Sequence, residues 1–200
     1  MARDADARER AARAIEAFLD ALGYTIEGEL VGTGRRVADT WIDELVAGER
    51  TDPAALLRGG ALDLGEGAHG VVVLRDVSIA TMCPHHLLPS HGKVTLGYLP
   101  NRLAAGLGSL AQAAEACARR LVLQETLGET IARAVMKGLD ARGAFCRLQL
   151  VHTCFATRGE RQSSSVVDTL ALEGVFEQEM RDVAMLMCSG APSSSEPRTP

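Results

Sequence analysis

Apolar residues at helical spacing predict two helices at the start of the chain. The apolar positions fall four residues apart: Ala14, Phe18 and Leu22 in the first helix, and Val37, Trp41 and Leu45 in the second. We expect the first helix over residues 5–22, ended by Gly23. The second should start after an N-cap at Thr33 and end at Gly48. Residues 49–69 are glycine-rich and weakly periodic, which predicts a connection with about one helical turn.

The chain then changes to short apolar runs that are typical of strands. Strands are expected at residues 71–74 with 77–79, 93–99, 145–156 and about 165–172. Two capping-box sequences, which begin at Ser109 and Thr126, predict helices that run to about Leu123 and Leu139. The order of these elements predicts an α+β fold, in which an antiparallel sheet is packed on one face by a helix pair.

The predicted elements divide the chain into three parts. Residues 1–68 form an N-terminal helical region, residues 69–188 form the α+β domain, and residues 189–200 form a polar, proline-containing tail that we expect to be disordered. The sequence holds no glycine-rich phosphate loop of the P-loop or dinucleotide type.

Composition and charge exclude several function classes. The 200 residues carry 21 Lys and Arg against 26 Asp and Glu, a net charge of −5, whereas binders of nucleic acid or membrane surfaces need a basic excess. No stretch approaches the roughly 18 uninterrupted apolar residues of a membrane span. The charged start lacks the apolar core of a signal peptide, so we expect a cytoplasmic protein whose five cysteines stay reduced.

Two short segments carry the candidate chemistry. Cys83 and His86 are three residues apart, a spacing that lets a turn present both side chains to one metal ion. Alternation along the strand predicted at 145–156 places His152 and Cys154 on one face, in line with Cys146. The alternative is that Cys83 is a buried thiol beside loop histidines that face solvent, and that His152 and Cys154 are core residues of a buried strand. We prefer the core interpretation for Cys146 alone.

A shared site would combine two sulfurs and one nitrogen, from Cys83, His86 and Cys154, a donor set that suits zinc. Three protein ligands leave a fourth position for water, as in catalytic zinc sites. His85 and His152 would lie beside that water and relay protons at physiological pH.

Several segments together resemble the GTP cyclohydrolase I family, over residues 10–176. They are Cys83-Pro84-His85-His86-Leu87-Leu88-Pro89, Gly92-Lys93-Val94, Gly97-Tyr98-Leu99-Pro100-Asn101, Ala118-Arg119-Arg120-Leu121 with Gln124-Glu125, and His152-x-Cys154 with Arg158-Gly159. The resemblance implies the tunnelling fold (T-fold), with residues 69–188 as its catalytic domain. It also implies a homo-oligomeric ring with sites at subunit interfaces and a bound zinc ion.

The resemblance also implies roles for individual residues. The zinc ligands would be Cys83, His86 and Cys154; the acid/base histidines would be His85 and His152; and the substrate-binding residues would be Gln124, Glu125, Arg158 and Arg36. Gln124 and Glu125 would grip the guanine edge, because a carboxylate can accept from both the ring N–H and the 2-amino group. From the residues alone, Glu125 also fits a helix-start carboxylate.

The chain departs from the family pattern at its phosphate-binding positions. The Ser, Lys and Arg that hold the triphosphate read here as Gly108, Ser109 and Gln112. Two further family lysines fall on Gln162 and Asp39. Arg161, Arg119, Arg120 and the helix start at Ser109 are the candidate replacements. Nearer the metal ligands, Pro84 stands in place of a glutamate and Ser90 in place of a phenylalanine.

The function implied is that of a hydrolase. Zinc-activated water attacks carbon 8 of a guanine-type purine, the imidazole ring opens, and carbon 8 leaves as formate, giving a dihydropterin when the substrate is GTP. Three alternatives stay open. They are the same chemistry on a phosphate-poor substrate such as guanosine or 8-oxoguanine, a non-catalytic purine- or pterin-binding or regulatory homologue, and a structural zinc protein.

Overall fold

A computed structural model describes residues 5–189 of the chain. Its helices are α1 (Ala5–Ala21), α2 (Thr33–Thr40), α3 (Pro53–Gly59), α4 (Leu107–Ala118), α5 (Gln124–Leu139), α6 (Thr153–Ala156) and α7 (Arg181–Cys188). Its strands are β1 (Ala61–Asp63), β2 (Val72–Met82), β3 (Pro89–Leu99), β4 (Leu103–Ala105), β5 (Gly143–His152) and β6 (Val167–Gly174). Short helical turns η1 (Gly28–Leu30), η2 (Trp41–Leu45) and η3 (Ala47–Arg50) join the first helices.

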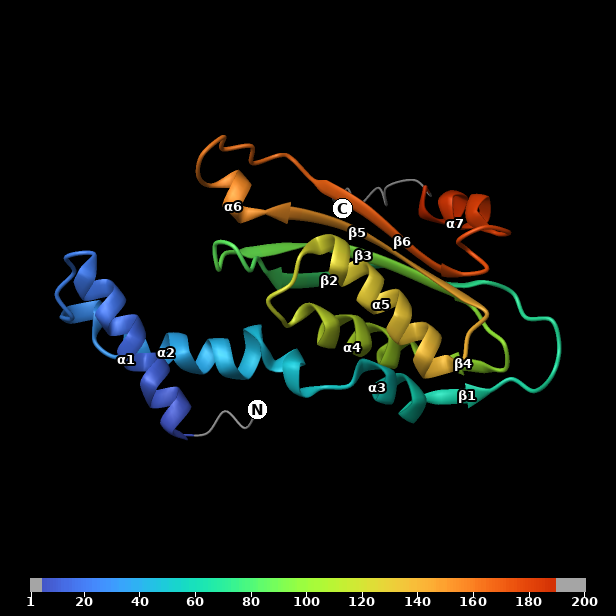
Figure 1. The fold of residues 1–200 in the computed structure, drawn as a ribbon, viewed down its shortest axis with the longest axis horizontal. Helices are drawn as coiled ribbons and strands as arrows, with labels where there is room; N and C mark the ends of the chain where they lie inside the picture. The colour runs from blue at the N-terminus through green and yellow to red at the C-terminus, as the bar shows by residue number, and fades with distance from the viewer. Residues whose placement is uncertain (1–4, 190–200) are drawn as a thin grey trace, which may run out of the picture.

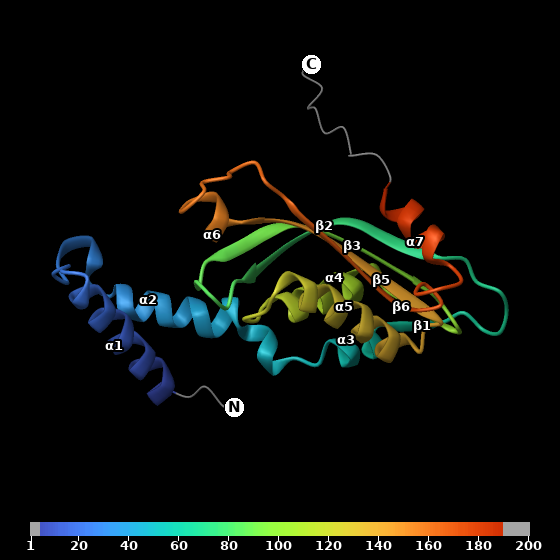
Figure 2. The same ribbon diagram turned by 45° about the horizontal axis from the view of Figure 1, so that its top comes forward.

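The centre of the fold is a four-stranded antiparallel sheet with the order β2-β3-β5-β6. Helices α4 and α5 cover one face of this sheet (Figures 1 and 2). The predicted α+β class, the antiparallel sheet and the helix pair on one face are therefore confirmed. Within residues 5–189, no helix combines the length and apolar character needed to cross a membrane.

The main core lies between the sheet and the helix pair, because alternate side chains of each strand point toward the helices. Leu96, Tyr98, Leu148 and Leu150 from the strands are buried there, and so is Leu57 of α3. The Tyr98 hydroxyl accepts a hydrogen bond from the Ala105 backbone N–H at 2.9 Å, which satisfies this polar group inside the core.

The opposite face of the sheet carries a smaller core beneath α7, visible above the sheet in Figure 2. Phe145 and Phe176 meet there edge to face with their ring centroids 5.1 Å apart. The sequence pattern predicts neither α7 nor the two-stranded sheet that β1 and β4 form.

The N-terminal helices pack as a hairpin that projects from one end of the sheet (Figure 1). Helix α1 lies over the predicted range, and Gly23 follows it with a left-handed φ of 86°. The apolar positions Phe18 and Leu22 do not lie on the side of α1 that is buried in this chain, since Phe18 is 61% exposed and Leu22 is 59% exposed. The buried side of α1 instead packs against α2 at Gly34. A Cβ added to Gly34 would lie 2.5 Å from the carbonyl oxygen of Ala12 in α1.

Several element boundaries differ from the prediction. The second helix has Gly32 as its N-cap and continues from α2 into a π-helical turn, η2. The connection 49–69 holds the two-turn helix α3, whose N-cap Asp52 accepts from the Ala54 N–H at 2.9 Å, as well as β1. The predicted tail lies outside the described residues from position 190 onward.

Neither predicted capping box starts its helix. Helices α4 and α5 begin two residues or more earlier, with Gly106 and Leu123 as N-caps. Tertiary contacts fix these starts: the Gly106 N–H donates to the Gly60 carbonyl at 3.2 Å, and the Gln124 side chain is anchored in the sheet. Helix α4 ends at Ala118 rather than at Leu123, whereas the predicted end of α5 at Leu139 is confirmed.

Candidate metal centre and active site

The first two candidate ligands lie on the tight loop between β2 and β3. The Cys83 carbonyl accepts from the Leu87 N–H at 2.9 Å, and the Cys83 N–H donates to the Leu88 carbonyl at 2.9 Å. Pro84 suits this turn because its ring fixes φ and it has no N–H to satisfy. The turn brings the Sγ of Cys83 to 3.8 Å from the Nδ1 of His86.

The third candidate ligand, Cys154, lies on the short helix α6 and not on a strand. Strand β5 ends at His152, so the predicted alternation that carried the strand face on to Cys154 was wrong. The hydroxyl of Thr153 donates to the Pro89 carbonyl at 2.6 Å, and the Thr157 N–H donates to the Thr153 carbonyl. These bonds turn the chain at the end of β5 and bring Cys154 toward the β2–β3 loop.

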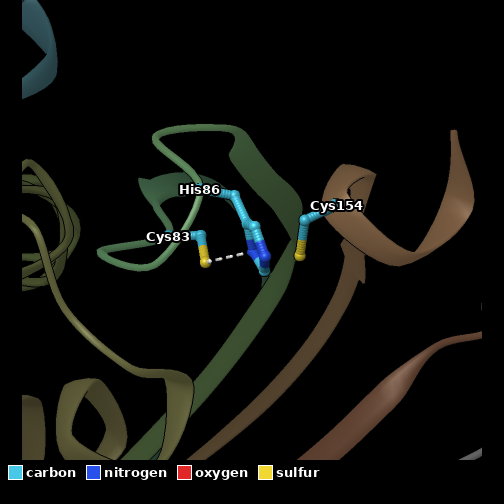
Figure 3. Close-up of side chains that lie close together, drawn as sticks. All are labelled: Cys83, His86 and Cys154. Atoms are coloured by element: carbon cyan, nitrogen blue, oxygen red, sulfur yellow. Dashed lines mark hydrogen bonds between the residues drawn. The ribbon is translucent and has the colours of Figure 1, made fainter. Parts of the chain in front are cut away.

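The three side chains converge, as Figure 3 shows. One donor atom from each of Cys83, His86 and Cys154 lies within 4.8 Å of the other two. Ligands about 2.0–2.3 Å from a tetrahedral zinc ion lie roughly 3.5–3.8 Å from one another. Small movements of the three side chains would therefore bring their donor atoms to the distances that a zinc ion requires. Two sulfurs and one imidazole nitrogen form a donor set that fits zinc.

The thiol of Cys154 sits in a setting that favours its protonated form in the absence of a metal ion. Burial raises its pKa, and the neighbouring Cys83 thiol raises it further, while the positive charge of Arg158 opposes both effects. All five cysteines are free thiols, and Cys146 is fully buried in the core, as expected.

His152 is held by hydrogen bonds on both ring nitrogens. Its Nε2 lies 2.7 Å from the Oε1 of Gln124, and its Nδ1 lies 2.9 Å from the Oγ of Ser90. Burial lowers the pKa of His152, against a smaller opposing effect of the Glu125 charge, which favours the neutral imidazole.

Gln124 is 3% exposed, and both ends of its amide are engaged within the protein. Its Nε2 lies 3.1 Å from the Leu148 carbonyl, 2.9 Å from the Val167 carbonyl and 3.1 Å from the Thr169 hydroxyl. The amide therefore anchors the start of α5 to the sheet and orients His152. Contact between this side chain and a substrate stays a prediction.

The candidate metal ligands, the two candidate catalytic histidines, Gln124 and Glu125 line one cavity of about 270 Å³. Its lining includes Cys83, His85, His86, Ser90, Gln124, Glu125, His152 and Cys154. The imidazole of His85 is exposed and packs edge-on against His86, with ring centroids 6.2 Å apart. The Glu125 side chain is exposed in the first turn of α5, where the helix dipole favours a carboxylate. The cavity thus combines metal donors, imidazoles and a carboxylate.

The two arginines predicted to bind substrate, Arg158 and Arg36, do not line this cavity. Arg158 is exposed just after α6, near enough to Cys154 to affect the pKa of that thiol. Arg36 is not among the residues that line the cavity of this chain. Its guanidinium donates to the Val31 carbonyl at 3.0 Å and the Glu29 carbonyl at 3.1 Å, which closes the loop before α2.

Of the cations considered as replacements for the family's phosphate ligands, two have partners within the chain. Arg120 donates to the carbonyls of Gly48 at 2.9 Å and Thr51 at 3.1 Å, so it fastens α4 to η3. Arg119 forms an ion pair with Glu115 one turn earlier in α4. Arg161 is exposed on the loop after α6.

The contact between Ser90 and His152 is not apparent from the sequence, where Ser90 is only a departure from the family pattern. The contact follows from strand register, since Ser90 and His152 are directly opposite in the β3–β5 pair. The register between two strands cannot be read from the sequence. A small polar residue in a buried strand does, however, indicate that a polar partner lies on the paired strand.

Comparison with known proteins adds an independent line of evidence. The family model described as GTP cyclohydrolase I matches residues 11–189. The chain is 34% identical over 168 residues to "GTP cyclohydrolase 1" of Wolinella succinogenes, covering 84% of this chain and 88% of that protein. It is 35% identical to the protein of that name from Rhodopirellula baltica, covering 87% and 75%, and 33% identical to the one from Bacillus subtilis, covering 86% and 90%.

Proposed function

The chain belongs to the GTP cyclohydrolase I family and is a hydrolase of that type; we propose that it works with a zinc ion held by Cys83, His86 and Cys154. A first water adds to carbon 8 of a guanine-type purine and opens the imidazole ring to a formamide, and a second water hydrolyses that formamide and releases carbon 8 as formate. With GTP as the substrate, the product is a dihydropterin.

The convergence of the three donor side chains carries this proposal. They come from two segments far apart in the sequence, and their donor atoms lie within 4.8 Å of one another beside a cavity. When bound, zinc supplies a water molecule activated for attack on carbon at neutral pH. Three protein ligands leave room for that water, which is the pattern of catalytic rather than structural zinc sites.

The other residues of the cavity bind the substrate and move protons. The Glu125 carboxylate accepts from the ring N–H and the 2-amino group of guanine, a two-point contact that other bases do not offer. His85 and His152 line the same cavity, and an imidazole is a side chain suited to proton transfer at the breaking carbon–nitrogen bonds. Arg158 contributes positive charge near Cys154, one of the residues that line the cavity.

We also propose that the T-fold domain spans residues 69–188, that the chains assemble into a ring with shared sites, and that the enzyme works in the cytoplasm. Arg36 supports the shared site, because it is one of the family's substrate residues yet lies outside the cavity of its own chain. Strands β2 and β6 are the edges of the sheet and offer backbone groups for pairing. Five free thiols favour a reducing compartment.

A second candidate function is the same ring opening on a phosphate-poor purine. The first turns of α4 carry Gly108, Ser109 and Gln112, none of which is cationic. Arg120 is held by backbone carbonyls, which removes one of the candidate replacements. Each lost charge-assisted contact weakens phosphate binding by about 1.5–3 kcal/mol.

The test is a panel of purines offered one at a time to the zinc-loaded protein: GTP, GMP, guanosine, guanine and 8-oxoguanine. Product mass and pterin fluorescence after oxidation are measured for each, together with formate, or with carbon dioxide for 8-oxoguanine, whose carbon 8 is already at the oxidation level of a urea carbon. Formate with a pterin from GTP supports the first function, and turnover of a phosphate-poor purine without turnover of GTP supports the second. Zinc binding with no turnover of any purine would contradict both and leave the non-catalytic homologue.

A further inference from the structure

Ser90 is a buried polar residue whose hydroxyl points at a candidate catalytic histidine. It is 1% exposed, it lies on β3 directly opposite His152 on β5, and its Oγ is 2.9 Å from the Nδ1 of His152. Ser90 also lines the cavity of the site. A hydroxyl and a ring nitrogen at this distance form a hydrogen bond, but distance alone does not say which of them donates.

The direction of the bond follows from Gln124. Its Nε2 faces the carbonyls of Leu148 and Val167, and because carbonyls only accept, this end of the amide is the donor. The Oε1 end must then accept from His152, at 2.7 Å, so the Nε2 of His152 carries the proton. The neutral form of an imidazole has one donor and one acceptor nitrogen, so in that form of His152 the Nδ1 accepts and the Ser90 hydroxyl donates.

We propose that Ser90 is a positioning residue for His152. Its hydroxyl donates to Nδ1 while Gln124 accepts from Nε2, and the two contacts hold the ring at one angle to the cavity in the Nε2–H tautomer. The link to catalysis rests on the proposed function, in which His152 takes part in the reaction. The assignment of the hydrogen bond between Ser90 and His152 does not depend on the proposed function.

The first test is nuclear magnetic resonance of the imidazole nitrogens in the full chain, which reports the tautomer and the acceptor contact without any turnover. We expect His152 to show a protonated Nε2 and a hydrogen-bonded Nδ1. The acceptor signature of Nδ1 should be lost in Ser90→Ala and kept in Ser90→Thr. A wild-type spectrum with the proton on Nδ1, or an unchanged Nδ1 signal in Ser90→Ala, would overturn the proposal.

The second test is steady-state kinetics on whichever purine the wild type turns over. Misplacement of a catalytic group lowers kcat more than it weakens ground-state binding, so Ser90→Ala should lose about 10- to 100-fold in kcat with KM changed less than about twofold. Ser90→Thr, which keeps the hydroxyl, should recover most of kcat. Equal kcat for wild type and Ser90→Ala would overturn the positioning role.

Ser78→Ala is the matched control, because Ser78 is a strand serine of the same sheet with one hydroxyl contact, to Lys93 at 2.8 Å, outside the cavity. Its kcat and its His152 spectrum should match the wild type. If the wild type turns over no purine, the proposed function fails, while the nitrogen spectrum still decides whether Ser90 donates to His152.

Discussion

The sulfur atoms of Cys83 and Cys154 lie within 4.8 Å of each other, although one belongs to the β2–β3 loop and the other to α6. The Nδ1 of His86 is 3.8 Å from the first of these sulfurs. An ion bound by all three residues would tie the two segments together at one end of the sheet. Metal content and local stability should therefore change together.

Replacement of Cys154 by alanine should abolish stoichiometric zinc binding, since two remaining ligands do not complete a stable site. We expect about one zinc per chain in the wild type by elemental analysis and a small fraction of that in Cys154→Ala. Zinc should raise the Tm of the wild type only. Cys188→Ala is the control, because Cys188 lies in α7 on the other face of the sheet. Full zinc content in Cys154→Ala would remove this residue from the ligand set.

Gln124→Met should destabilise the fold, because it leaves two carbonyls and His152 without their partner. The expected loss is about 2–4 kcal/mol in the free energy of unfolding, measured with urea. Gln112→Met makes the same chemical change on the exposed surface of α4 and should stay within about 0.5 kcal/mol of the wild type. Equal effects of the two variants would show that the buried amide contributes little.

The thiols of the main core should resist alkylation. Burial raises the pKa of Cys117 to about 11 and raises that of Cys146 as well. At pH 8 the thiolate fraction of Cys117 should be about a hundredfold below that of a thiol with an ordinary pKa of 9.0. Mass spectrometry after iodoacetamide treatment should find both thiols unmodified in the native protein and modified in urea. Rapid native labelling of either one would contradict their burial.

Gly92→Ala should be strongly destabilising, because an added Cβ would lie 2.0 Å from the Gln149 carbonyl oxygen on the neighbouring strand. The expected loss is more than about 3 kcal/mol, with weaker pairing of β3 and β5 near Ser90 and His152. Gly108→Ala is the matched change in α4, where nothing lies within 4 Å, and helix propensity predicts a gain of up to about 1 kcal/mol. Thermal unfolding of both variants gives the comparison, and a Gly92→Ala protein as stable as the wild type would refute the close strand approach.

The sequence predicted that Cys83, His86 and Cys154 come together better than it predicted the local structure that carries them. The spacing of Cys83 and His86 is local, so it could be read directly, and the structure brings both residues to Cys154. The strand alternation that included Cys154 failed because periodicity does not show where a strand ends. That end depends on the Thr153 hydroxyl, which bonds to the Pro89 carbonyl of a neighbouring strand.

The fold class could also be predicted from the sequence, because most of its defining elements are long. Long elements such as β2, β5 and α5 carry enough residues for their period to show. Short elements show no clear hydrophobic period, as is the case for the three-residue strands β1 and β4 and the eight-residue helix α7. These elements are stabilised by tertiary contacts. For α7 these contacts include the burial of Phe176 and Ala184 against the sheet.

The most direct test of the account is the fate of carbon 8. The zinc-loaded protein is given GTP labelled with 13C at carbon 8, and labelled formate is quantified against GTP consumed, with Cys154→Ala as the zinc-deficient control. We predict about one labelled formate for each GTP consumed by the wild type and none from the control. GTP consumed with the label retained in the purine product, or formate released equally by Cys154→Ala, would contradict the central claim.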